Sequence, residues 1–253
     1  MYKRPPYINV PVEFAQFCLR ERKVTEGKIY LCCHFLYPGK VSVSRDVYID
    51  IAAFCDTSVR TVYDKLKWLK DRNWIGKDEK RDWMFIRGIN RVHKMEGFKY
   101  SRCGLMVRND FQHFKSFLIG TVLASIVITG NTGSGTDRLS RRSGPTRFPV
   151  SLFTIKKALN VSEKTAYNYR KLAQKYGYIK MVSNLQQVVG ITPKDVWIIK
   201  QNEINKIELK LFGSTEIITV KSKKLRTDRG YVYIQNSNII TPKVKLKKRK
   251  LNR

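Results

Sequence analysis

The chain has 253 residues, with 50 Lys and Arg against 20 Asp and Glu, so its formal net charge is +30. Because self-repulsion at this charge is costly, the composition predicts a polyanionic partner: nucleic acid first, an anionic membrane surface second. The hydrophobic fraction of 42% is sufficient for a packed core and argues against global disorder. The most apolar run, Phe117–Ile128, is shorter than the roughly 20 residues that span a bilayer, so no membrane partner is expected.

The N-terminus is interrupted by three prolines and does not read as a signal peptide. The five cysteines form no CxxC pair, and Cys32, Cys33 and Cys55 fall in apolar, helix-like stretches where a thiol acts as a small hydrophobe. We therefore expect reduced thiols, no metal and no cofactor. The predicted location is cytoplasmic and nucleoid-associated, or packaged with DNA in a virion.

Residues 1–11 are expected to form an N-terminal arm, and residues 12–100 a first domain. In the latter, the sequence predicts a helix over Thr25–Leu36, a short strand in KVSVS, a second helix in VYIDIAAFC and a third helix that begins at Ser58. Two strands around a charged turn follow, in WIG and WMFIR. This order is typical of a winged helix-turn-helix.

Residues 101–192 repeat that order as a second domain. The predicted helices are DFQHFKSFLIGTVLASIVI, SLFTIKKAL and a third helix capped by Ser162, with FPV as the short strand. The segments YIKMV and QQVVGI are expected to pair as the wing. An insert at residues 129–146 reads as a flexible loop, whose Arg138, Arg141 and Arg142 are expected to settle onto phosphates when DNA binds.

Residues 193–241 predict a small β extension, with a hairpin in KIELKLF and EIITVKS and a third strand in GYVYIQ. Residues 242–253 form a basic tail that is predicted to be disordered and to clamp DNA without reading its sequence, through Lys247, Lys248 and Arg249. The expected fold class is therefore α+β: two winged helix-turn-helix domains in tandem, followed by a β extension and a basic tail.

An internal repeat supports the two-domain reading. Ile51–Ile75 aligns with Ile155–Ile179 over 25 residues without a gap, at a constant offset of 104. The identical pairs are Ile51/Ile155, Ser58/Ser162, Thr61/Thr165, Tyr63/Tyr167, Lys67/Lys171 and Ile75/Ile179. A period near 100 is too long for a solenoid and indicates two copies of a small domain.

Helical spacing separates an inner and an outer face in each third helix. The inner positions are Val62, Leu66 and Leu69 in the first copy, and Ala166, Tyr169, Leu172 and Ala173 in the second. The outer stripes are Arg60, Asp64, Lys67 and Asp71, and Lys164, Asn168, Lys171 and Lys175. With the flanking Thr61, Tyr63, Thr165 and Tyr167, these outer residues are the candidate DNA contacts, apart from Asp71, whose charge opposes phosphate.

The two stripes differ in charge. Lysines bind phosphate or guanine, and Asn168 can contact adenine bidentately, so the second helix is expected to carry most of the base reading. The first stripe holds Asp64 and Asp71, and phosphate repels both carboxylates. We expect the first copy to read DNA weakly or to serve partly as a homodimer surface.

The motifs SVRTVYDKLKWL and SEKTAYNYRKLA, within residues 12–191, resemble the tandem winged-helix replication initiators of plasmids and phages. That resemblance implies binding of repeated origin DNA by both units, more strongly by the second, with dimerisation through the first. Regulators of phages and mobile elements share the same building block. Residues 129–146 and the β extension depart from the family's pattern.

Two other classes stay open at this point. A sequence-tolerant DNA-coating or virion-associated structural protein also suits a charge of +30, although coating requires no capped reading helix. A DNA-processing enzyme is less well supported, because His34, His93 and His113 form neither the His-x-x-Arg of a tyrosine recombinase nor the paired histidines of a rolling-circle nickase. Clustered carboxylates for a two-metal nuclease are also missing from the sequence, and no small-molecule substrate is indicated.

Overall fold

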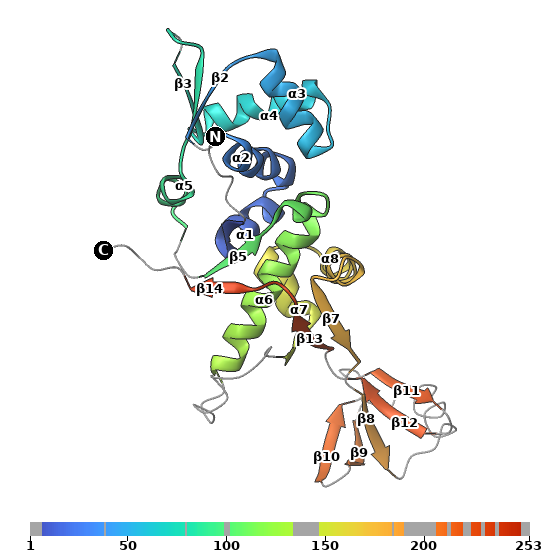
Figure 1. Ribbon diagram of the computed structural model, residues 1–253. Helices are drawn as coiled ribbons and strands as arrows, with labels where there is room; N and C mark the ends of the chain where they lie inside the picture. Colours follow the sequence, from blue (N-terminus) through green and yellow to red (C-terminus); the bar gives the residue numbers. More distant parts are fainter. Residues whose placement is uncertain are drawn as a thin grey trace.

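A computed structural model of the chain shows an α+β fold in which helices pack against small antiparallel sheets (Figure 1). The residues that it describes are 7–37, 39–78, 80–98, 102–133, 147–183, 185–189, 206–211, 214–219, 224–228, 231–235 and 238–248. The predicted insert arginines and Arg249 lie outside these residues.

The first repeated unit places three helices beside a three-stranded sheet. Its elements are α2 (Val24–Leu36), β2 (Lys40–Ser42), α3 (Arg45–Cys55), α4 (Val59–Asp71), β3 (Ile75–Asp78) and β4 (Trp83–Ile86). The strand order in the sheet is β2-β4-β3, so the last strand lies between the other two. The helices and strands of this unit follow the order predicted from the sequence.

The second repeated unit has the same arrangement. Its elements are α6 (Phe114–Gly133), β6 (Phe148–Pro149), α7 (Leu152–Leu159), α8 (Glu163–Lys175), β7 (Ile179–Val182) and β13 (Ile239–Pro242). The strand order is β6-β13-β7, and again the last strand lies between the other two. The repeat in the sequence therefore corresponds to a repeat of topology.

The correspondence extends to individual backbone groups at the corner between the paired helices. Ser58 and Ser162 each accept a hydrogen bond from the backbone amide three residues later, at 3.1 and 3.2 Å. Asp56 and Asn160, which end α3 and α7, take left-handed conformations with φ of 50° and 49°. Asp and Asn are the side chains that tolerate this region best after glycine, so both corners close in the same way.

The wing of the second unit differs from the prediction. Residues 185–189, expected to pair with β7, instead form β8 (Leu185–Val189) at the centre of a separate five-stranded sheet, and β7 pairs with β13. The other strands of that sheet are β9 (Lys206–Leu211), β10 (Ser214–Thr219), β11 (Lys224–Asp228) and β12 (Tyr231–Gln235). The predicted β9–β10 hairpin is confirmed, and the sheet lies beyond the ends of β7 and β13 (Figure 1).

A third small sheet joins the two ends of the chain. Its order is β1-β5-β14, formed by β1 (Ile8–Pro11), β5 (Arg102–Met106) and β14 (Leu246–Lys248). Part of the predicted disordered tail is therefore an ordered strand, which corrects that expectation. The tail alternates apolar and basic residues, and β5 offers it a free edge once β1 has paired on the other side.

One hydrophobic core runs through both units. The helix α1 (Val12–Arg20) packs against α6, although it precedes the first unit in the chain. After α5 (Ile89–Met95), the short 3₁₀ helix at Arg108–Phe111 inserts Phe111 between the units. The Phe111 ring centroid lies 4.8 Å from that of Phe54 and 5.8 Å from that of Phe35. The same ring stacks on Phe114 of α6, with centroids 6.3 Å apart, so aromatic contacts link the two units.

Cysteine burial agrees with the sequence reading, since Cys32, Cys33 and Cys55 are at most 2% exposed and serve as small apolar side chains.

Among the described helices, none has both the length and the apolar character needed to cross a membrane. The apolar helix α6 instead forms the centre of the second unit, where Leu118, Val122 and Leu123 are fully buried.

Candidate nucleic-acid interface

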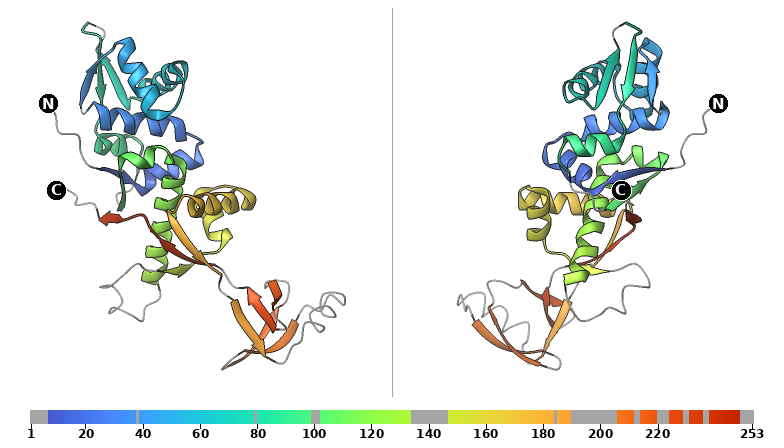
Figure 2. Two further views of the ribbon diagram at one scale, coloured as in Figure 1. Left: turned by 45° about the vertical axis from the view of Figure 1, so that its right-hand side comes forward. Right: turned by 90° about the vertical axis from the view of Figure 1, so that its left-hand side faces the viewer.

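The candidate interface consists of the outward faces of α4 and α8, and the two helices lie on the same side of the molecule (Figures 1 and 2). On α4, the side chains of Arg60, Asp64, Lys67 and Asp71 are all exposed, and Val62, Leu66 and Leu69 are buried beneath them. The predicted inner and outer faces of this helix are confirmed. Its outer face carries two cations and two carboxylates, so the charges balance.

The outward face of α8 is uniformly basic apart from one amide. Lys164, Asn168, Lys171 and Lys175 are exposed, as predicted, and Ala166 and Ala173 are buried. A shallow groove of about 550 Å³ runs over Asn168, Lys171 and Lys175. Glu163, the one acid of α8, lies in the first turn of the helix, where its negative charge interacts favourably with the positive end of the helix dipole.

The equivalent tyrosines of the two helices have different partners. The ring of Tyr63 stacks on Tyr48 of α3, with centroids 4.2 Å apart and planes 16° from parallel. The ring of Tyr167 instead lies 4.8 Å from the Lys171 ammonium. A hydrogen bond from Lys171, with the charges of Lys171 and Arg170, lowers the pKa of the Tyr167 phenol. The second tyrosine therefore belongs to the basic face of its helix.

Arg170 was not predicted as a site residue, and its surroundings are unusual. Only 9% of the side chain is exposed, and among the described residues its Nε has no hydrogen-bond partner and no carboxylate pairs with it. Burial lowers the pKa of its guanidinium group. The guanidinium carbon lies 5.8 Å from the Tyr167 ring centroid. The alignment of the two repeats could have predicted that Arg170 is buried, because Arg170 occupies the position that Leu66 has in the first copy.

The remaining predicted contacts divide into three groups. The hydroxyls of Thr61 and Thr165 are engaged with the capping serines, at 2.8 and 2.9 Å, so they support the helix ends. Lys247 is exposed within β14, and Lys248 follows it in the same strand. This sheet is distinct from α4 and α8, so the structure does not join these lysines to the two helices. Arg138, Arg141, Arg142 and Arg249 lie outside the described residues.

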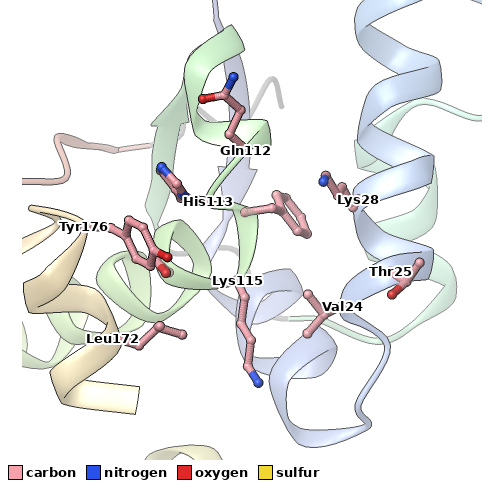
Figure 3. Close-up of a pocket in the computed structure, with 10 residues that line it drawn as sticks. Val24, Thr25, Lys28, Gln112, His113, Lys115, Leu172 and Tyr176 are labelled. Atoms are coloured by element: carbon pink, nitrogen blue, oxygen red, sulfur yellow. The ribbon is translucent and has the colours of Figure 1, made fainter. Parts of the chain in front are cut away.

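A cavity of about 290 Å³ lies between the two units, and we call it the interunit cavity (Figure 3). One wall is the start of α2, with Thr25 and Lys28. The opposite wall is the end of α8, with Leu172 and Tyr176, and the start of α6 lies between them.

The start of α6 and the residues before it contribute basic and polar groups to this cavity. His113 stacks on Tyr176, with ring centroids 3.9 Å apart, and Lys115 and Gln112 are also exposed there. The lining residues include no carboxylate. Sequence reasoning missed this site because its walls come from three segments that are distant along the chain.

Over the described part of the chain, no group of three or more His, Cys, Asp or Glu side chains is arranged to hold a metal ion. Comparisons with family models, with curated proteins and with solved structures found no match to this chain.

Proposed function

We propose that this protein binds double-stranded DNA through two winged helix-turn-helix units, with α4 and α8 as their recognition helices. The observation that carries the proposal is the outward face of α8, where Lys164, Lys171 and Lys175 surround Asn168 and no carboxylate interrupts them. A helix of this kind fits the major groove, in which lysine and asparagine side chains reach phosphates and base edges.

The matching topology of the two units supports the same proposal. In each, a helix, a strand, two helices joined by a tight corner and two further strands follow in order, and the last strand is central. The net charge of +30 supplies the sequence-independent attraction to phosphate. Within this reading, we propose the role of a sequence-specific replication initiator or regulator of a plasmid, phage or mobile element.

A selection of bound sequences from a random duplex pool tests the proposal, followed by salt titration on one selected and one scrambled duplex. We expect one sequence to be enriched and its affinity to fall by orders of magnitude between low and moderate salt, since roughly 6–10 phosphates would be contacted. Absence of duplex binding, or a flat salt titration, would refute the proposal. Steep salt dependence without enrichment would indicate a DNA-coating protein instead.

A further inference from the structure

The interunit cavity concentrates positive charge that no acid offsets. Lys28 and Lys115 both line it, and neither is paired with a carboxylate in the described part of the chain. Two nearby lysines behave differently, because Lys23 and Lys65 both contact the Glu26 carboxylate, at 3.4 and 3.2 Å. One carboxylate therefore offsets part of the charge of these two lysines, whereas no carboxylate pairs with the two lysines that line the cavity in the described part of the chain.

The two cavity lysines are held in place by neutral partners. The Lys28 ammonium donates a hydrogen bond to the Cys55 carbonyl oxygen at 2.6 Å, immediately before the corner that leads into α4. The Lys115 ammonium lies 4.9 Å from the centroid of the Tyr169 ring on α8. Each lysine thus contacts the structure that supports one of the two proposed recognition helices.

The position and size of the cavity fit a phosphate group. The two proposed recognition helices lie on the same side of the molecule, and the walls of the cavity come from α2, which packs on α4, and from α8 itself (Figures 1 and 3). A volume of about 290 Å³ holds a phosphate group with several waters, each of which takes roughly 30 Å³. Thr25 also lines the cavity, and a hydroxyl is a neutral donor of the kind that contacts phosphate oxygens.

We propose that the interunit cavity binds a backbone phosphate of a DNA duplex that contacts both units at once. This inference rests on the proposed DNA-binding function and adds to it a third contact, between the two recognition helices. A phosphate held there fixes the register of the two units on one duplex, because contacts to the sugar-phosphate backbone position a protein without reading bases.

The test is the salt dependence of binding to the selected duplex by Lys115→Met and Lys28→Met variants of the full chain. Each lost phosphate contact reduces the slope of log affinity against log salt by about 0.9. Because the cavity binds one phosphate, we expect a reduction of up to this size for either variant and no more than this size for the two substitutions together, equally on selected and scrambled duplexes. Lys94→Met is the matched control, because Lys94 is an exposed lysine on α5, on the other side of the molecule (Figure 1), and should leave the slope unchanged.

The outcomes separate this inference from the proposed function. If the wild-type chain binds no duplex, the proposed function fails. If it binds duplex and Lys115→Met has the wild-type slope, the inference alone is overturned. Lys115 is exposed, so its variant should fold even if loss of the Lys28 hydrogen bond unfolds Lys28→Met. Inorganic phosphate serves as a second probe: if it raises the Tm of the wild type but not of Lys115→Met, while the DNA slopes stay equal, the cavity binds free phosphate and the DNA claim is wrong.

Discussion

Leu66 and Arg170 occupy the same position in the two repeated helices, and both side chains are buried, with 1% and 9% of their surface exposed. Leu66 belongs to the hydrophobic core, whereas Arg170 brings a guanidinium group that no carboxylate neutralises in the described part of the chain. A buried charge without an ion pair lowers the free energy of unfolding. A buried charge that lowers stability is expected where the function of the protein requires it.

Replacing Arg170 with the residue of the first copy tests this relationship. We expect Arg170→Leu to raise the free energy of unfolding by about 1–3 kcal/mol, measured by urea denaturation, because it removes the desolvation cost of the charge. The same variant should bind duplex DNA more weakly. The reverse substitution, Leu66→Arg, is the control for the stability measurement and should destabilise the first unit. A lower stability of Arg170→Leu would show that the guanidinium group is held by stabilising contacts.

The helix caps should contribute equally in the two units. Ser58→Ala and Ser162→Ala each remove a side-chain acceptor from the first turn of a proposed recognition helix, so each should lower the free energy of unfolding by about 1 kcal/mol. Ser162→Gly serves as the control. It should lower the free energy of unfolding by only about a few tenths of a kcal/mol, since glycine leaves the helix end accessible to water. Equal losses for alanine and glycine would contradict the role assigned to the hydroxyl.

The five-stranded sheet is inserted between two strands that already pair with each other. Val182 of β7 faces Ile239 of β13, so Ser183 and Asn238 can close a hairpin across a two-residue turn. Replacing residues 184–237 with Asn-Gly, the pair favoured in such turns, should leave a folded chain that still binds duplex DNA. Circular dichroism and a thermal melt check the fold. Loss of cooperative unfolding would show that the inserted sheet is needed to hold the second unit together.

His34 predicts a pH-dependent part of the stability. Its Nε2 contacts the Arg87 carbonyl oxygen at 2.9 Å, and burial lowers its pKa despite that hydrogen bond. Below about pH 6.5 the unfolded chain therefore binds more protons at this site than the folded chain, and stability decreases as the pH falls.

The measurement for His34 is the free energy of unfolding at pH 7 and at pH 5. His34→Gln keeps a donor for the carbonyl oxygen and cannot titrate, so its stability should fall less than that of the wild type over this interval. The same decrease in both proteins would mean that other groups account for the pH dependence.

The sequence predicted what depends on local chemistry. Ser58 and Ser162 revealed the starts of α4 and α8, because a hydroxyl before an amphipathic stretch is a direct capping signal. Helical spacing separated Val62, Leu66 and Leu69 from the exposed stripe, since one face of the helix packs on the core.

The sequence did not reveal the pairings that depend on distant partners. The sequence of β8 is compatible with pairing either to β7 in the wing or within the inserted sheet. The strand that pairs with β7 in the structure is β13, which comes much later in the chain, after residue 238. Burial of Arg170 was missed because a charged residue at an inner position reads as exposed until its neighbours are known. The interunit cavity needed α2, α6 and α8 to be placed in space.

The central claim is that α8 reads DNA bases and α4 contributes less. Binding curves for Asn168→Ala and Arg60→Ala on one selected and one scrambled duplex test it most directly, with Lys171→Ala as the control for phosphate contact. We expect Asn168→Ala to lose about 1–3 kcal/mol on the selected duplex alone, because a bidentate contact to one base is removed. Lys171→Ala should weaken both duplexes evenly, and Arg60→Ala should have the smallest effect, since Asp64 and Asp71 already oppose a close approach of phosphate. If Arg60→Ala abolishes the preference for the selected duplex while Asn168→Ala retains it, the claim is wrong and α4 is the reading helix.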